Sequence, residues 1–167
     1  ERYVAVCSDP VQEQRRRKWR KHNSLKPTQP LIYVRAFAWK EMPQAEAVCE
    51  DPFCRHYENI LRQHLFWNAL NDDAVFEPWL TVQATRLCSG WGLSGERRYS
   101  GCRRGAFKVD YPIKDYSEIE KLHVPRHEID EAQTAQDVQR LCDAVGDVIP
   151  VNVDRGPAYR GPAADLS

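Results

Sequence analysis

The sequence has no charge excess of either sign and no long hydrophobic run. Lysine plus arginine and aspartate plus glutamate each number 24 in 167 residues, so the formal net charge is zero. Proteins that bind nucleic acids or anionic membranes draw affinity from an excess of basic residues, which this chain lacks. No window approaches the ~20 apolar residues of a membrane span, and the N-terminus has no signal-peptide pattern. We therefore expect a cytoplasmic protein that binds neither nucleic acid nor membrane.

A recognisable metal-binding motif is also missing. The six cysteines form no Cys-x-x-Cys pair, and without a secretory signal they are expected to be reduced thiols. The spacing of Cys49 and Cys54 matches no common zinc site. His123 and His127 come nearest to a histidine pair, but Pro125 between them prevents the helical turn that would put both on one face. We expect no metal within this chain.

What the sequence does contain is the composition of one globular domain. Hydrophobic residues make up 42% and charged residues 29%, and 167 residues suffice for a real core. The chain begins at Glu1 without a methionine and stops at Ser167 soon after a strand-to-loop transition. These two ends predict a piece of a longer protein.

Helix starts are marked by aspartates, several followed by proline. An aspartate at the cap position accepts a hydrogen bond from a free backbone N–H, and proline fits the first helical position. The residues after Asp51 form an apolar stripe at helical spacing, in which His64 is expected to be a core-edge histidine rather than a catalytic one. The predicted helices run from Pro10 to about Asn23, from Pro52 to Asn71, briefly after the capping box Asp115 to Glu118, and from Asp130 to Gly146.

Three apolar, β-branched runs predict strands, each carrying a charged residue near its end. The runs are Leu31 to Ala36 with Arg35, Ala74 to Thr81 with Glu77, and Val148 to Asp154. Alternating with helices, they predict a parallel α/β sheet with right-handed crossovers. Two further pieces, Glu96 to Tyr99 and Ala106 to Val109, predict a β-hairpin between the second and third strands.

The charged strand ends are the candidate functional residues. In parallel α/β folds, ligands bind at the carboxyl ends of the strands, where the loops converge. Arg35 and Glu77 are either ligand-binding residues or halves of structural salt bridges, and both interpretations stay open. Asp154 and Arg155 are held by the Gly156-Pro157 break and are either site residues or a pair that shapes the loop.

One basic run, Arg15 to Lys21, lies within the first predicted helix. It is interpreted mainly as a solvated helix face, with contact to an anion or a partner as the alternative.

Four segments resemble a bacterial branch of the uroporphyrinogen decarboxylase superfamily, which also contains cobamide methyltransferases. The similarity spans roughly residue 8 onward. The segments are Arg35 to Met42, Asn71 to Trp79, Lys108 to Tyr116 and Val151 to Arg160. Members of the superfamily are (β/α)8 barrels about twice as long as this chain. The resemblance therefore implies the N-terminal part of a TIM barrel, with residues 1–30 as a helical extension and residues 31–167 holding the first three parallel strands, the hairpin and their helices.

The resemblance implies an enzyme that decarboxylates a tetrapyrrole. Arg35 corresponds to one arginine of the loop that grips the substrate carboxylates, with Arg155 as a second substrate-binding residue. Glu77 and Asp154 are the carboxylates expected to be catalytic, since a carboxylate stabilises the cationic ring intermediate. Trp39, Trp79 and Tyr159 are expected either to stack on the flat substrate ring or to close the barrel mouth as packing.

Decarboxylation needs no cofactor in this chain. The first alternative implied by the family is a methyltransferase that works with a corrinoid protein and with a zinc bound by later parts of the intact protein. The second is a non-catalytic module that binds a small anion. The fragment alone is expected to be inactive, and a homodimer is possible for the intact protein.

Overall fold

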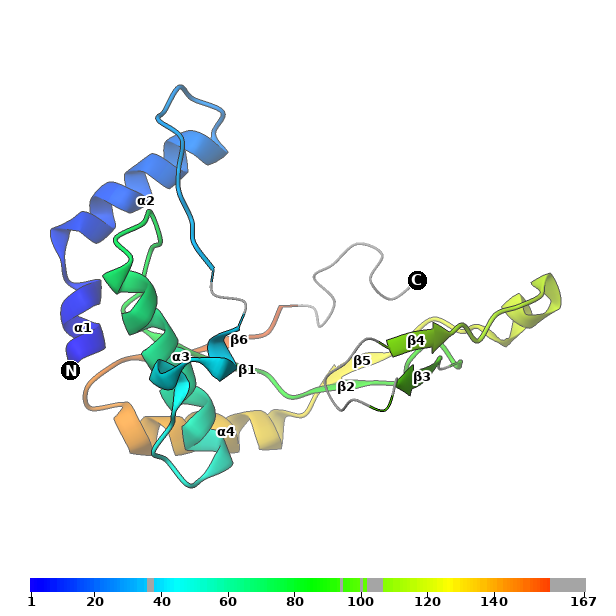
Figure 1. Cartoon of the computed structure of the whole chain (residues 1–167). Helices are drawn as coiled ribbons and strands as arrows, with labels where there is room; N and C mark the ends of the chain where they lie inside the picture. The colour runs from blue at the N-terminus through cyan, green and yellow to red at the C-terminus, as the bar shows by residue number, and fades with distance from the viewer. Residues whose placement is uncertain (36–37, 94, 100, 102–106, 157–167) are drawn as a thin grey trace. The chain divides into compact units, whose positions relative to one another are not determined.

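The computed structural model describes residues 1–35, 38–93, 95–99, 101 and 107–156, and it divides the chain into two compact units. The first unit comprises residues 1–82 and 137–152, and the second comprises residues 83–136 together with the chain from residue 153. Figure 1 traces the elements along the chain. Helix and strand are mixed, as predicted.

Helices make up most of the first unit. They are α1 (Arg2–Cys7), α2 (Pro10–Asn23), α3 (Pro52–Ala69), the short 3-10 turns η1 (Trp39–Glu41) and η2 (Pro43–Ala45), and the greater part of α4 (Glu131–Val145). Asp9 accepts from the Val11 N–H at 2.9 Å and Asp51 accepts from the Cys54 N–H at 2.9 Å. The predicted starts of α2 and α3 are thus confirmed with their caps.

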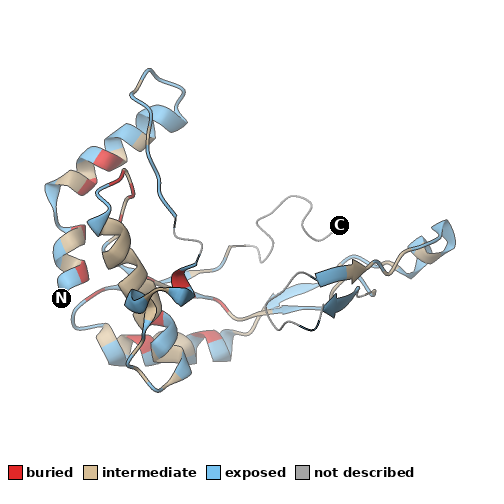
Figure 2. Cartoon of the chain, viewed as in Figure 1, coloured by how far each residue is buried: buried red, intermediate tan, exposed pale blue. Residues whose placement is uncertain are grey.

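The core of the first unit joins α1, α3 and α4 to the chain between residues 74 and 82. Figure 2 shows buried residues on these elements. The best-buried side chains include Val82 and Leu141, each 2% exposed, and Phe76 at 3%. The cluster consists of Tyr3, Cys7, Tyr57, Ala74, Phe76, Leu80, Val82, Leu141 and Ile149.

The first predicted strand is wrong. Residues 31–35 are not in a strand, and residue 36 lies outside the described residues. The N–H groups of Ile32 and Val34 donate to the carboxylates of Asp73 and Asp72, at 3.0 and 2.8 Å, instead of to a neighbouring strand. Aspartate side chains therefore accept the backbone hydrogen bonds that a neighbouring strand would accept in a sheet.

The second predicted strand is displaced toward its end. The strand β1 covers Leu80–Gln83, and residues 74–77 are irregular. The polar groups of this irregular stretch are bonded by helix side chains: the Phe76 N–H donates to Gln12 Oε1 at 3.0 Å, and Arg15 donates to the Ala74 carbonyl at 3.3 Å. The sequence pattern correctly indicated a buried, extended run. It did not indicate that side chains of α2, rather than another strand, would bond to the backbone of this run.

The third predicted strand is present as β6 (Val151–Asp154), paired with β1. The Leu80 N–H donates to Pro150 O and the Ala84 N–H donates to Asp154 O, so both partners advance by the same number of residues and the pair is parallel. Three parallel strands were predicted. Among the described residues, the structure contains one parallel pair, β1 with β6.

The second unit contains two antiparallel ladders. The predicted hairpin is confirmed as β3 (Glu96–Tyr99) paired with β4 (Phe107–Asp110), with Tyr99 opposite Phe107. The strand β2 (Arg86–Cys88) pairs with β5 (His127–Ile129). The predicted short helix is the 3-10 helix η3 (Tyr116–Lys121), which begins with the expected capping box of Asp115 and Glu118.

Candidate functional site

An open groove of about 500 Å³ lies on the first unit and contains one of the predicted catalytic residues, Glu77. One wall is formed by α2, and the other by residues 75–77 and the extended segment at Tyr33. Its lining residues are Arg16, Trp19, Arg20, Asn23, Tyr33, Val75 and Glu77. The volume is in the range of small-molecule sites, about 300–1,000 Å³.

The spacing of the α2 residues explains why they share the groove. Residues three or four positions apart in a helix lie on one face, which brings Arg16, Trp19, Arg20 and Asn23 into line. On the opposite wall, Val75 and Glu77 are two residues apart in an extended chain and point to the same side. Helix and extended chain therefore both contribute side chains to the lining of the groove.

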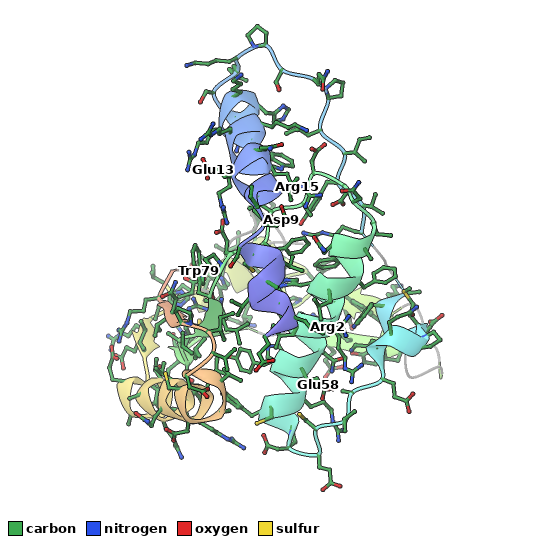
Figure 3. All side chains as sticks on the ribbon, turned by 90° about the vertical axis from the view of Figure 1, so that its left-hand side faces the viewer. Arg2, Asp9, Glu13, Arg15, Glu58 and Trp79 are labelled. Carbon is green, nitrogen blue, oxygen red and sulfur yellow. The ribbon has the colours of Figure 1, made fainter. Side chains whose placement is uncertain are left out.

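Three α2 side chains, of which Trp19 also lines the groove, join the helix to residues 73–76. The Trp19 indole N–H donates to Asp73 O at 2.7 Å, and Gln12 and Arg15, which are 0% and 5% exposed, make the bonds described above. Figure 3 shows Arg15 and Glu13 on different sides of α2. Because of these bonds, the helical wall of the groove has a fixed position relative to residues 73–77.

The carboxylate of Glu77 is held by Arg16. Arg16 Nη2 lies 2.9 Å from Glu77 Oε2, and the same nitrogen donates to Phe76 O at 3.1 Å. The Glu77 side chain is 39% exposed and that of Arg16 is 23% exposed, so the pair lies at the groove surface. The result is a carboxylate of fixed direction that still faces solvent.

Behind Glu77 lies a buried polar cluster on α1 and α3. The Tyr3 hydroxyl donates to Glu77 O at 3.0 Å and lies 3.2 Å from His64 Nδ1. Burial, and secondarily the positive charge of Arg35, lowers the pKa of His64 to about 4. Burial also raises the pKa of Tyr3. His64 is therefore neutral at pH 7 and positions Tyr3, in agreement with the predicted core-edge role.

Arg35 is held by aromatic rings. Its guanidinium carbon lies 3.8 Å from the ring centroid of Tyr33 and 4.1 Å from that of Trp67. Burial lowers its pKa, while the charge of Asp72 opposes this shift. Arg35 contacts Tyr33 and Trp67, whereas Glu77 contacts Arg16 and Tyr3, so the structure does not join these two predicted residues.

Two of the three predicted ring-binding aromatics lie in the described part of the chain, and they differ in exposure. Trp39 is 8% exposed and packs against Phe66, with ring centroids 5.7 Å apart, which is the packing role. Trp79 is 38% exposed (labelled in Figure 3). Tyr159 lies outside the described residues.

In the second unit, Asp154 and Arg155 bond to different elements. Asp154 ends β6, accepting from Gln83 Nε2 at 3.2 Å and from the Gly156 N–H at 2.8 Å. Arg155 makes a bidentate pair with Glu131 at 2.7 and 2.6 Å. The hydrogen bond from Arg155 lowers the pKa of Glu131. Both residues thus shape the turn after β6.

The arginines and the tryptophan of α2 were not among the predicted site residues. Their signal was present as the basic run, for which anion contact was the alternative interpretation. The solvated-face interpretation is wrong for Arg15, which is buried, and agrees with Arg17 and Arg20, whose side chains are 72% and 71% exposed. The helical spacing of Arg16 and Arg20 could have indicated a shared face.

No cluster of three or more His, Cys, Asp or Glu side chains suited to a metal is found in residues 1–35, 38–93, 95–99, 101 and 107–156. Within those ranges no helix has the length and apolarity needed to cross a membrane.

Comparison with known proteins returned no similarity: no protein-family model, curated protein or solved structure matches the chain.

Proposed function

We propose that the chain is the N-terminal part of a uroporphyrinogen-decarboxylase-like enzyme that binds a tetrapyrrole and decarboxylates its side chains. The observation that best supports this is the setting of Glu77 in an open groove, with its carboxylate directed by Arg16 at 2.9 Å. A fixed carboxylate stabilises positive charge that develops near it without having to reorient during the reaction.

The chemistry needs a group that stabilises a cation. Protonation of a pyrrole ring makes the ring an electron sink, after which the bond from the side-chain methylene to its carboxylate breaks and CO2 leaves. The electron pair enters the ring, a second proton adds to the methylene carbon, and the first proton leaves the ring. We assign the stabilisation of this cation to Glu77, with Asp154 as the second catalytic carboxylate of the intact site, and no cofactor is required.

The other predicted residues retain roles within this proposal. Arg35 and Arg155 would bind substrate carboxylates. To do so, Arg35 would leave the aromatic rings that it contacts, and Arg155 would leave Glu131. Trp79 and Tyr159 would contact the substrate ring. Trp39 is assigned to packing, because it is 8% exposed.

The proposed fold is the first part of a (β/α)8 barrel. The parallel pair of β1 and β6 supports this proposal, because parallel strands connected through a helix are the repeating unit of such barrels; here α4 and the strands β2 to β5 lie between the two in sequence. Further parallel strands would pair at the edges of β1 and β6. Cytoplasmic location and homodimer formation stay predictions.

Titration with two ligand classes tests the function. An octacarboxylate porphyrin is added to the protein and its main absorption band is followed, and a cobalamin is titrated in parallel. A saturable shift with the porphyrin is expected, and a shift with neither ligand would rule out a tetrapyrrole or corrinoid function. A shift with cobalamin alone would instead favour the corrinoid methyltransferase with its zinc, and porphyrin binding without CO2 release by the whole protein would favour a binding module.

A pair of glutamate variants tests the assigned role in the whole protein, with the reduced porphyrinogen as substrate. Glu77→Gln keeps the shape of the side chain and removes its charge, so CO2 release should fall about 100-fold or more while ligand affinity changes little. Glu13→Gln is the matched control, because Glu13 also pairs with Arg16 (3.9 Å) but does not line the groove. Equal rates for the two variants would remove Glu77 from the mechanism.

A further inference from the structure

Of the two arginines that line the groove, Arg20 makes the longer and more exposed ion pair. Arg16 directs its guanidinium to Glu77 and to Phe76 O. The Arg20 side chain is 71% exposed, and the carboxylate beside it is that of Glu13, 3.7 Å away. Glu13 is shared with Arg17 at 3.2 Å. An exposed arginine with a distant, shared partner binds an incoming carboxylate at little cost, because no close hydrogen bond must break first.

The charge of the lining points to the same ligand. Two arginines and one glutamate line the groove, so its lining carries one net positive charge, although the whole chain is neutral. Arg16 pairs closely with Glu77, and Arg20 is balanced only by Glu13, which lies outside the groove lining and is shared with Arg17. An anionic group is therefore favoured at the Arg20 end of the groove.

Two aromatic rings form a corner beside this arginine. The rings of Trp19 and Tyr33 are 6.2 Å apart and meet at 84°. The Trp19 N–H bond to Asp73 O fixes one ring, and the guanidinium of Arg35, 3.8 Å from the Tyr33 centroid, lies over the other. A flat ring in such a corner can stack on one aromatic and turn its edge to the other, which are the two favoured geometries.

We infer that this groove binds a flat heteroaromatic ring carrying a carboxylate side chain, with Arg20 as the carboxylate-binding residue and Trp19 and Tyr33 as the ring-binding residues. The groove takes one such ring of a larger ligand rather than enclosing a macrocycle. The identification of that ring as a pyrrole rests on the proposed function; the ring-plus-carboxylate chemistry comes from the groove.

The test uses a monopyrrole bearing an acetate and a propionate, with its neutral dimethyl ester as the comparison ligand, and isothermal titration calorimetry as the measurement. Arg20→Gln is expected to weaken acid binding about 10-fold or more, the equivalent of one charge-assisted hydrogen bond. Arg17→Gln, one turn away and outside the groove, should stay within about two-fold, since exposed pairs contribute little. The ester should bind wild type no better than it binds Arg20→Gln.

A second pair of variants tests the ring contact without altering α2. Tyr33→Leu should weaken binding several-fold, whereas Tyr33→Phe, which keeps the ring, should stay within about two-fold, because the stacking energy belongs to the ring. Circular dichroism at 222 nm checks that each variant is folded.

The outcomes separate this inference from the proposed function. If the porphyrin binds but Arg20→Gln and Arg17→Gln behave alike for both ligands, the groove assignment is overturned and the tetrapyrrole function stands. If the monopyrrole acid binds in an Arg20-dependent manner while the porphyrin does not bind, the groove assignment stands and the tetrapyrrole function falls. Equal affinity for acid and ester, or binding of neither, overturns the groove assignment.

Discussion

The two units of the chain differ in how much of their own surface they bury. Of the hydrophobic residues that are buried in the described part of the chain, all except Ala84 lie in the first unit. In the second unit large apolar side chains remain exposed, including Tyr99 at 57% and Phe107 at 48%. Figure 2 shows this contrast between the red positions of the first unit and the pale blue of the hairpin. The first unit therefore has a core of its own, while the second is held mainly by backbone pairing.

The arginines of the two units differ in the same way, although Thr134 of the second unit is also buried and accepts from the Thr85 N–H at 3.1 Å. In the first unit Gln12 and Arg15 are buried and bond to backbone far away in sequence. In the second unit Arg98 pairs with Asp110 at 2.8 Å on the surface, with 70% of the arginine side chain exposed. Buried tertiary hydrogen bonds fix one arrangement, whereas exposed pairs contribute little to stability. The groove lies on the unit that has the fixed arrangement.

Truncating one phenylalanine in each unit should give the largest contrast. Phe76→Ala removes a ring that is 3% exposed and should cost about 3–5 kcal/mol of unfolding free energy. Phe107→Ala removes a half-exposed ring and should leave the main unfolding transition in place. Urea unfolding followed at 222 nm reports chiefly on the first unit, because most helices lie there.

Hydrogen exchange is the companion measurement for Phe107→Ala. Amides of β3 and β4 should exchange faster in the variant, because an isolated hairpin is marginally stable and loses the Tyr99 contact, whose centroid lies 5.8 Å from that of Phe107. Equal shifts of the urea midpoint for the two variants would show that the units share one core.

Lowering the pH should weaken the first unit through His64. The folded pKa is depressed to about 4 by burial, and the unfolded pKa is about 6.5, so the unfolded chain binds the extra proton between these values. Stability is therefore fully present above about pH 6.5 and is lost as the pH falls toward 4, by about 3 kcal/mol at 1.36 kcal/mol per pKa unit.

The variant His64→Gln provides the check. Its unfolding free energy should depend less on pH between 6.5 and 4 than that of the wild-type protein, measured by urea unfolding at several pH values. Parallel pH profiles for the two proteins would mean that His64 is accessible to protons in the folded state.

The smallest effect is expected at the surface pair of the second unit. Arg98→Ala should cost less than about 1 kcal/mol of hairpin stability, because the partner Asp110 keeps Lys114 at 3.0 Å and both pairs are exposed. The cost, measured by hydrogen exchange of β3 and β4, should shrink in 1 M salt, where the Debye length is about 3 Å. A large loss that persists in salt would indicate a buried role for Arg98.

The parts of the fold that depend on near neighbours in sequence could be predicted. Capping aspartates stand next to the N–H groups that they accept from, so the starts of α2, α3 and α4 followed from short sequence patterns. The β3–β4 hairpin is likewise local. For the candidate site, the sequence supplied Glu77 and the basic run that contains Arg16 and Arg20.

Strand partners and the groove could not be predicted, because they depend on residues distant in sequence. An apolar run forms a strand only where another strand bonds to its backbone, and residues 74–77 are bonded instead by Gln12, Arg15 and Arg16, about 60 positions away. The same contacts bring α2 beside Glu77. The sequence thus determined α2, α3, α4, the hairpin and the charges, whereas α1 was not predicted. Tertiary packing decided which arginine remains accessible, since Arg15 became buried, Arg16 paired with Glu77 and Arg20 stayed exposed.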